Sequence, residues 1–300
     1  MSIQKEIAQL SRQFLFLRMI QSISVVGAGT MGSGIALAAA LKNYPVILFD
    51  IQEAVLESAK KSIQKNLQWL VDKQKITLQQ KDAAWALITF TPSITNCKAD
   101  LIVEAVVEKL NIKIDLFNQL AAINQPNCIL ASNTSSLSIN AIQKNINKPE
   151  RVAGLHFFNP AHIMKLVEVV QGNQTSDETA QQLITFCTNI SKVPVLCKDA
   201  PGFIVNRVAR HYYLEAMHLA LEKNIPIEKI DAAMEAAGFK MGPFKLMDMI
   251  GMDVNLAVST SLYEAFDGAE RFKPSPLQIE KVANGELGRK TGKGFYEYNS

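Results

Sequence analysis

One stretch, residues 22–50, constrains the fold of this chain more than any other. A short run rich in β-branched residues, a turn with three glycines and a helix of small residues follow one another there, and a second apolar run ends at Asp50. The glycines, Gly27, Gly29 and Gly32, have the G-x-G-x-x-G spacing. This order of strand, turn, helix and strand predicts a βαβ unit that binds a dinucleotide.

The glycines of this turn allow contacts that a side chain would block. The first allows a tight turn off the strand, the second removes a Cβ that would keep the backbone from a pyrophosphate, and the third lets the helix pack closely on the sheet. The helix N-terminus then faces the phosphates. The spacing alone is also compatible with a glycine turn in another kind of α/β sheet. With its flanking strands, it leads us to expect cofactor contacts along the whole turn, which consists of Gly27, Ala28, Gly29, Thr30, Met31 and Gly32.

Asp50 follows the second strand of this unit and predicts which dinucleotide is bound. A carboxylate at this place accepts hydrogen bonds from the adenosine ribose hydroxyls and repels a 2′-phosphate. The next two residues, Ile51 and Gln52, supply no cation that would offset the repulsion. The predicted cofactor is therefore NAD rather than NADP.

Beyond residue 50, short apolar strands alternate with amphipathic helices, which predicts a parallel sheet. Helices are expected over residues 53–75 and 177–190, and a loop followed by a helix over 104–122. Strands are expected at 88–90, 101–103, 128–131, 152–157, 165–170 and 193–196. From residue 202 onward the periodicity is helical, and a strand is expected only at 295–298. The predicted fold class is α/β: an N-terminal Rossmann-type dinucleotide-binding domain followed by a mostly α-helical C-terminal domain.

These patterns divide the chain into three parts. An N-terminal extension over residues 1–19 precedes the NAD-binding Rossmann domain over 20–201, and a helical substrate and dimerisation domain covers 202–300. We assign no function to the extension. A ligand crevice is expected between the two domains, at the carboxyl ends of the strands.

Composition places the chain among ordinary globular proteins. Of its 300 residues, 48% are hydrophobic and 20% are charged, and the net charge of +3 lacks the basic excess typical of nucleic-acid-binding proteins. Residues 22–41 are apolar enough to suggest a membrane span, but the βαβ unit explains their glycines and small residues better. The scattered cysteines lack metal-ligand spacing, so we expect a cytoplasmic protein with no metal and with free thiols at Cys97, Cys128, Cys187 and Cys197.

His156 is the candidate for the catalytic base of an NAD-dependent oxidation. Such a reaction needs a proton acceptor beside the carbon that loses hydride, and histidine titrates near neutral pH. His156 ends a predicted strand and precedes a turn-forming Asn-Pro pair, so its ring is expected to reach the cleft. A lone strand-end histidine is more often structural, but the residues around this one favour catalysis.

Glu168 is the candidate partner of His156. It is an acid inside the apolar run 165–170, where burial is costly unless the carboxylate is paired. A carboxylate behind the imidazole would fix its tautomer and stabilise its cation. The alternative is an edge-strand glutamate that faces water.

Ser135 and Asn206 are candidates for holding the reacting oxygen. Ser135 lies in the polar run SNTSS after a predicted strand, and Asn206 lies in the run DAPGFIVNR at the domain boundary. Both side chains can hydrogen-bond an alcohol or carbonyl oxygen near His156 and polarise it. A turn serine and a helix-capping asparagine are the structural alternatives.

Several segments occur along the chain in this order: GAGTMGSGIA, VEAVVEKLNIK, SNTSSL, GLHFFNP, MKLVEVV, KDAPGFIVNR, MGPFKLMD and KTGKGFYEY. Together they resemble the 3-hydroxyacyl-CoA dehydrogenase family, and especially its stand-alone short-chain members, the 3-hydroxybutyryl-CoA dehydrogenases. The likeness runs from about Ile20 to Tyr298. The combination of HFFNP with DAPGFIVNR is far more specific than the glycine motif.

The resemblance implies roles for the matching residues. It makes His156 the catalytic base, paired with Glu168, and it implies that Ser135 and Asn206 contact the substrate. Lys73 matches a position that contacts coenzyme A, and Asn66 stands nearby where the resemblance suggests a serine. Family members are usually homodimers built through the helical domain. The residues implied to line the nicotinamide cofactor's site are Ser135, Glu108, Lys113, Asn159 and Lys290.

The resulting prediction is a reversible, NAD-dependent oxidation of (S)-3-hydroxyacyl-CoA to 3-oxoacyl-CoA, on short chains such as 3-hydroxybutyryl-CoA and acetoacetyl-CoA. His156 takes the hydroxyl proton while hydride leaves for the nicotinamide, and Glu168 stabilises the imidazolium. Two alternatives stay open. The chain could be a dehydrogenase of free hydroxy acids or sugar acids, like the lambda-crystallin relatives, or a non-catalytic NAD-binding protein.

Overall fold

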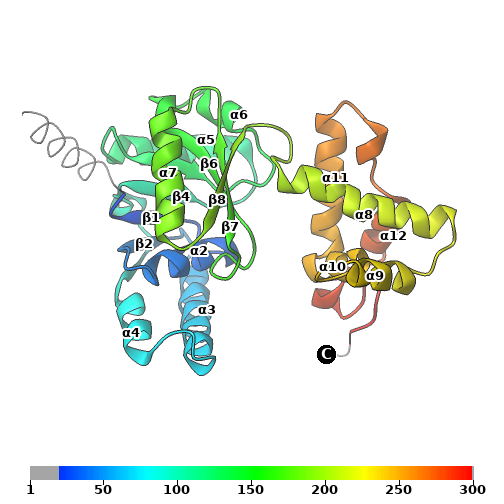
Figure 1. The fold of residues 1–300 in the computed structure, drawn as a ribbon. Helices are drawn as coiled ribbons and strands as arrows, with labels where there is room; N and C mark the ends of the chain where they lie inside the picture. The colour runs from blue at the N-terminus through cyan, green and yellow to red at the C-terminus, as the bar shows by residue number, and fades with distance from the viewer. Residues whose placement is uncertain (1–19, 299–300) are drawn as a thin grey trace, which may run out of the picture. The chain divides into compact units, whose positions relative to one another are not determined.

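The computed structural model describes residues 20–298, and the chain divides into two compact units between Asp199 and Ala200 (Figure 1). Each unit is described by itself. The extension predicted over residues 1–19 lies outside the described residues. Within residues 20–298, no helix combines the length and the apolar character that a membrane span requires.

An eight-stranded sheet forms the centre of the first unit, with the strand order β3-β2-β1-β4-β5-β6-β7-β8. In the part of the sheet that runs β3-β2-β1-β4-β5-β6, all neighbouring strands pair in parallel. The order reverses direction at β1, between β2 and β4, which makes this point the topological switch of the sheet. The strands are β1 (Ile23–Val26), β2 (Val46–Phe49), β3 (Ile88–Thr91), β4 (Leu101–Glu104), β5 (Ile129–Ser132), β6 (Val152–Phe157), β7 (Leu166–Gln171) and β8 (Val193–Lys198).

The sheet is not parallel throughout, because β7 pairs with β6 in the antiparallel sense and β8 follows β7 in parallel. Only residues 158–165 join β6 to β7. A parallel crossover needs a dozen or more residues and usually a helix, so this short connection returns the chain in the opposite direction. The antiparallel register places residue His156 opposite Glu168.

The sheet packs against helices through one apolar core. The central strands and α2 are almost wholly buried, and α2 consists mainly of glycine and alanine, so it can lie close to the sheet. The helices of this unit are α2 (Thr30–Ala40), α3 (Glu53–Asp72), α4 (Leu78–Ala86), α5 (Leu110–Ile123), α6 (Ile139–Gln143) and α7 (Asp177–Asn189), and short 3₁₀ turns occur at η1 (Ile94–Asn96) and η2 (Pro149–Arg151).

The single helix expected over residues 53–75 is shorter, and a second helix follows it. Helix α3 ends at Asp72, and Gln74 adopts a positive φ of 55°, which turns the chain. Helix α4 then begins after Thr77, whose side chain forms a capping box with Gln80. Figure 1 shows α3 and α4 as a hairpin of helices at the edge of this unit.

The second unit is helical, with a small apolar core around Tyr213, Met217, Phe244, Met247 and Met252. Its helices are α8 (Val205–Glu222), α9 (Ile227–Ala236), α10 (Pro243–Ile250), α11 (Met252–Ala265) and α12 (Pro276–Ala283), with 3₁₀ turns at η3 (Glu270–Phe272) and η4 (Arg289–Thr291).

The strand expected over residues 295–298 is absent, and that prediction was wrong. The segment makes only an isolated β-bridge, between Lys293 and Glu297. Two of its backbone N–H groups find a side-chain partner instead. The N–H groups of Phe295 and Tyr296 donate to the buried Asp248 carboxylate at 2.9 Å each. Such an anchor replaces the ladder that a neighbouring strand would supply.

Candidate active site

The carboxyl ends of β1, β4, β5 and β6 lie side by side and carry most of the predicted site residues. The glycine turn follows β1, and Ser135 follows β5 by a few residues. His156 lies one residue before the end of β6. In an open α/β sheet, the crevice beyond these strand ends is where ligands bind.

The glycine turn is shaped so that one glycine is open and two are closely packed. Gly27 has a φ of +103°, and a Cβ there would lie 2.6 Å from the carbonyl oxygen of Ala105. A Cβ on Gly32 would lie 1.7 Å from the carbonyl oxygen of Gly27. A Cβ on Gly29, the residue before α2, would meet nothing within 4 Å. The turn therefore exposes its backbone to a ligand at Gly29 and at the start of α2.

Asp50 is held at the end of β2 by two backbone N–H groups. Its Oδ2 accepts a hydrogen bond from Ala28 N at 2.9 Å, and its Oδ1 accepts one from Gln52 N at 3.0 Å. The bond from Ala28 ties the carboxylate to the glycine turn. Because an ionised carboxylate has about four acceptor positions, capacity remains for further donors such as ribose hydroxyls.

A buried charge network joins β4 to β5 and α5. The carboxylate of Glu104, which ends β4 with no exposed surface, accepts hydrogen bonds from Lys113 Nζ at 2.6 Å and from Ser132 Oγ at 2.6 Å. Lys113 Nζ also lies 3.2 Å from Glu108 Oε2. With 1% of its surface exposed, Lys113 is occupied mainly with holding these two carboxylates.

Sequence reasoning missed Glu104 and Ser132. The available signal was an acid that directly ends the apolar run Leu101–Val103 in the interior of the sheet. A buried carboxylate needs a partner, so this position predicts a cation nearby.

Glu108 fixes the turn that contains Ser135. Its Oε1 accepts hydrogen bonds from the hydroxyl of Thr134, from Ser135 N at 3.0 Å and from Ser136 Oγ at 3.2 Å. Burial alone would raise the pKa of Glu108, but the Lys113 ammonium and the hydrogen bonds from Thr134 and Ser135 lower it below the usual value. An ionised Glu108 therefore holds the serine turn at the strand ends.

His156 and Glu168 form a buried pair on neighbouring strands. His156 Nδ1 lies 2.7 Å from Glu168 Oε2, and 6% of the histidine and 1% of the glutamate are exposed. The alternative of a water-facing Glu168 is therefore wrong. The adjoining residue Phe157 donates its N–H to Asn133 Oδ1 at 2.9 Å, which ties the strand of His156 to the serine turn. The pair has the geometry of an imidazole base with an orienting carboxylate.

Three predicted residues line one hollow of about 350 Å³ in the first unit. Asn66 reaches it from α3, and Asn159 reaches it from the connection after β6. Thr30, at the start of α2, lines the same hollow. Lys73 lies just beyond α3 and is exposed.

The remaining predicted residues belong to the helical unit, so the first unit does not bring them together with His156. Asn206 is the second residue of α8. Lys290 lies in η4, where its Nζ pairs with Asp253 Oδ1. Within residues 20–298, no group of three or more His, Cys, Asp or Glu side chains is arranged to hold a metal ion.

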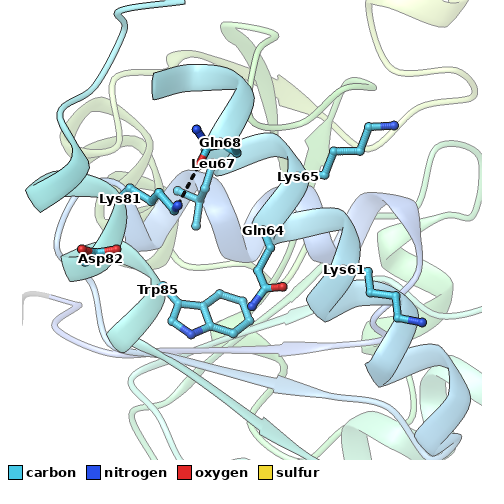
Figure 2. Close-up of a pocket in the computed structure, with 8 residues that line it drawn as sticks. All are labelled: Lys61, Gln64, Lys65, Leu67, Gln68, Lys81, Asp82 and Trp85. Carbon is cyan, nitrogen blue, oxygen red and sulfur yellow. Dashed lines mark hydrogen bonds between the residues drawn. The ribbon is translucent and has the colours of Figure 1, made fainter. Parts of the chain in front are cut away.

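A second hollow, of about 570 Å³, lies between α3 and α4 (Figure 2). Lys81 Nζ donates to Gln68 Oε1 at 2.7 Å, beside the indole of Trp85. Figure 2 shows the side chains of Lys61 and Lys65 extending away from Trp85 and Lys81. Because these cations do not converge on one point, the hollow is best understood as the joint between the two helices.

Comparison with known proteins gives the same family for both units. The family model described as 3-hydroxyacyl-CoA dehydrogenase, NAD binding domain, matches residues 22–200. The model described as 3-hydroxyacyl-CoA dehydrogenase, C-terminal domain, matches residues 202–298. The two matches together cover both compact units of the chain.

Individual relatives agree with these models. The chain is 46% identical over 283 residues to 3-hydroxyadipyl-CoA dehydrogenase of Escherichia coli. The aligned residues cover 94% of this chain but only 60% of that protein. It is 41% identical over 290 residues to the mitochondrial hydroxyacyl-coenzyme A dehydrogenase of Rattus norvegicus. These aligned residues cover 93% of this chain and 92% of that one.

Among solved structures, (S)-3-hydroxybutyryl-CoA dehydrogenase of Ralstonia eutropha superposes with a TM-score of 0.89 at 38% identity. The superposition covers 94% of this chain and all of that one. The resemblance found in the sequence motifs is thus confirmed along nearly the whole chain. The chain belongs to the 3-hydroxyacyl-CoA dehydrogenase family of NAD-binding oxidoreductases.

Proposed function

We propose that this protein catalyses the reversible, NAD-dependent oxidation of (S)-3-hydroxyacyl-CoA to 3-oxoacyl-CoA, on short acyl chains such as 3-hydroxybutyryl-CoA. The observation that carries the proposal is the buried pair of His156 and Glu168, in which His156 lies near the carboxyl end of β6, at the same edge of the sheet as the glycine turn after β1. A paired imidazole beside a dinucleotide site supplies the proton acceptor that alcohol oxidation requires.

His156 acts as the general base. Its Nδ1 is engaged with Glu168, so the hydroxyl proton of the substrate is taken up at Nε2. The positive charge that develops on the imidazole is stabilised by the Glu168 carboxylate, which also fixes the tautomer. Bound NAD supplies the acceptor for the hydride that leaves C3. In the reverse direction, the imidazolium returns the proton to the oxygen of the 3-oxo group.

Ser135 and Asn206 hold the reacting oxygen. The hydrogen bonds from the serine turn to Glu108 hold the backbone of Ser135 in place. A hydroxyl on a fixed backbone can donate to the carbonyl form of the substrate without first being reorganised. Asn206 contributes an amide from α8 of the helical unit.

The cofactor is NAD, and the glycine turn with Asp50 forms its adenosine and pyrophosphate site. The open backbone at Gly29 receives the pyrophosphate, and the Asp50 carboxylate receives the ribose hydroxyls. Glu108, Asn159 and Lys290 are proposed to line the nicotinamide end of the site. Because its ammonium is almost enclosed, Lys113 supports this end through Glu108.

The coenzyme A part of the substrate is proposed to run along α3, past Asn66 and Lys73. These two residues are seven positions apart, so they lie on the same side of the helical path. We further propose a cytoplasmic homodimer that associates through its helical unit, with neither nucleic acid nor membrane as a partner.

The test is to follow NADH absorbance with purified protein and acetoacetyl-CoA. Parallel reactions contain NADPH in place of NADH, free acetoacetate in place of the ester, and a 3-oxoadipyl-CoA substrate, because one relative is a 3-hydroxyadipyl-CoA dehydrogenase. Rapid oxidation of NADH with acetoacetyl-CoA, and little with NADPH or the free acid, is expected.

Each other outcome has a distinct meaning. Turnover of the free acid alone would move the protein to the hydroxy-acid dehydrogenases. A strong preference for the dicarboxylic ester would replace the short-chain assignment. Silence with every substrate would favour a non-catalytic NAD-binding protein.

A further inference from the structure

Lys192 is a buried lysine to which nothing in the sequence motifs draws attention. It lies between α7 and β8, and 8% of its surface is exposed. Its Nζ donates hydrogen bonds to two main-chain carbonyl oxygens, that of Ala161 at 2.6 Å and that of Met164 at 2.8 Å. Burial lowers the pKa of Lys192, which reflects the cost of keeping an ammonium there. A costly group that is directed at two carbonyls suggests a specific task.

Both carbonyls belong to residues 158–165, the connection that joins β6 to β7. These two strands carry His156 and Glu168, which are direct partners in the antiparallel register. Whatever fixes the connection therefore also fixes how the imidazole meets the carboxylate, since a slip of one residue would turn one of the two side chains to the other face of the sheet.

The connection is fastened at further points around Lys192. The N–H of Val193 donates to the carbonyl of Lys165 at 2.8 Å, so two successive residues hold three carbonyls of the connection. On the other side, the methyl group of Ala161 is buried against α2, where a Cβ on Gly34 would lie only 3.1 Å from it. The turn is thus held between α2 and the start of β8.

We propose that Lys192 is a positioning residue for the His156 and Glu168 pair. Its ammonium holds the turn between the two strands and so keeps the imidazole and the carboxylate in the arrangement needed for proton transfer. This inference rests on the proposed function, because the pair must be the proton-transferring pair for its alignment to affect turnover. It assigns Lys192 no contact with substrate or cofactor.

The main variant is Lys192→Met, which keeps a side chain of similar length and removes every donor. A second variant, Lys192→Gln, keeps one amide donor and covers the case in which the Met variant does not fold. The matched control is Gln143→Met. Gln143 is also buried, and its amide donates to the Val152 carbonyl at 2.8 Å, at the opposite end of β6 from His156. Both Met variants therefore remove a buried donor from the same strand system.

Lys192→Met is expected to lower kcat by roughly tenfold or more with acetoacetyl-CoA, because small misplacements of catalytic groups are costly. The same fall is expected with a truncated thioester, and the Kd for NADH should stay unchanged. The kcat of Lys192→Gln should lie between that of the wild type and that of Lys192→Met. Gln143→Met should lower Tm to a similar extent and leave kcat unchanged. Equal losses of kcat in the two Met variants, or normal turnover in Lys192→Met or Lys192→Gln, would overturn the proposal.

Hydrogen exchange supplies a readout that needs no turnover. The N–H groups of Ile163 and Met164 both donate to the Pro160 carbonyl within the connection. Their exchange should be faster in Lys192→Met and unchanged in Gln143→Met. Unchanged exchange in the lysine variants would refute the positioning role even if the wild type proved inactive. An inactive wild type with faster exchange in the lysine variants would instead reject the proposed function and keep Lys192 as the group that holds the turn.

Discussion

His156 Nδ1 lies 2.7 Å from Glu168 Oε2 across the one antiparallel pairing of the described sheet. If this pair transfers the substrate proton, His156→Gln should lower kcat by roughly two or more orders of magnitude, because no other base replaces the imidazole. The Kd for NADH should stay near the wild-type value. Stopped-flow turnover and fluorescence titration measure the two quantities, and near-normal turnover would remove His156 from the mechanism.

Glu168→Gln probes the second member of the pair. The amide cannot stabilise the imidazolium by charge, and it can favour the wrong tautomer, so a fall in kcat of about 10²-fold to 10⁴-fold is expected. The double variant His156→Gln/Glu168→Gln should be little slower than His156→Gln alone, because groups that act as a unit lose their effect together. Additive losses would show that the two side chains act independently.

Glu108 makes a testable contribution to stability as a function of pH. Its pKa is lowered from the ordinary value of 4.5, so the ionised form is favoured in the folded protein. The stabilisation is therefore complete above the unfolded value and is lost as the pH falls through the lower, folded value. The difference in Tm between wild type and Glu108→Gln should be constant above about pH 4.5 and shrink below it.

The control for this experiment is Glu57→Gln, which removes the carboxylate of a side chain that is 61% exposed and pairs with Lys60. An exposed pair contributes little, so this change should leave Tm almost unaffected at every pH. A Glu108→Gln difference that grows on acidification would contradict the lowered pKa.

Much of the first unit could be predicted because its signals are local. The glycine spacing and the acid at residue 50 lie within the single stretch 22–50 of the sequence. The structure brings Asp50 to the turn through a hydrogen bond from Ala28 N. The pairing of His156 with Glu168 was also expected, since an acid within an apolar run needs a partner. The antiparallel direction of the strand pairing that joins them was not predicted, although the expected strands at 152–157 and 165–170 leave a connection too short for a parallel crossover.

What could not be predicted depends on contacts between distant residues. Glu104 and Lys113 are nine positions apart, and only the packing of α5 on the sheet brings the ammonium to the carboxylate. Lys192 reads as an ordinary surface lysine, and its carbonyl partners lie about thirty residues earlier in the chain. The aromatic strand expected near Phe295 failed because a strand needs a neighbour, which a sequence pattern does not reveal.

Asp50 should determine the choice between NAD and NADP. Asp50→Asn removes the charge that repels a 2′-phosphate. The ratio of kcat/KM for NADH to kcat/KM for NADPH should therefore decrease. Some affinity for NADH should also be lost, because the side chain anchors Ala28 of the turn. Glu53→Gln is the control, since it removes the same charge from the exposed first turn of α3. An unchanged ratio in Asp50→Asn would refute the assignment.

Lys73 should bind the coenzyme A part of the substrate. Lys73→Ala is expected to raise KM for acetoacetyl-CoA more than KM for a truncated thioester, because only the full ester carries the phosphates. Lys75→Ala is the control, as this lysine is also exposed and lies in the turn after α3. Equal effects on the two substrates would make Lys73 an ordinary surface lysine.

The glycine turn allows two substitutions of the same kind to be separated by their consequences. In Gly32→Ala the new Cβ would overlap the backbone oxygen of Gly27, so a loss of about 1 to 3 kcal/mol in the free energy of unfolding, or more, is expected. In Gly29→Ala the new Cβ meets no protein atom within 4 Å, and the residue has an ordinary φ of −64°. The Tm of this variant should therefore equal that of the wild type. The same Cβ would stand where the pyrophosphate approaches, so Kd for NADH should rise. Denaturant unfolding and NADH fluorescence measure both variants, and unchanged NADH binding by Gly29→Ala would place the pyrophosphate elsewhere.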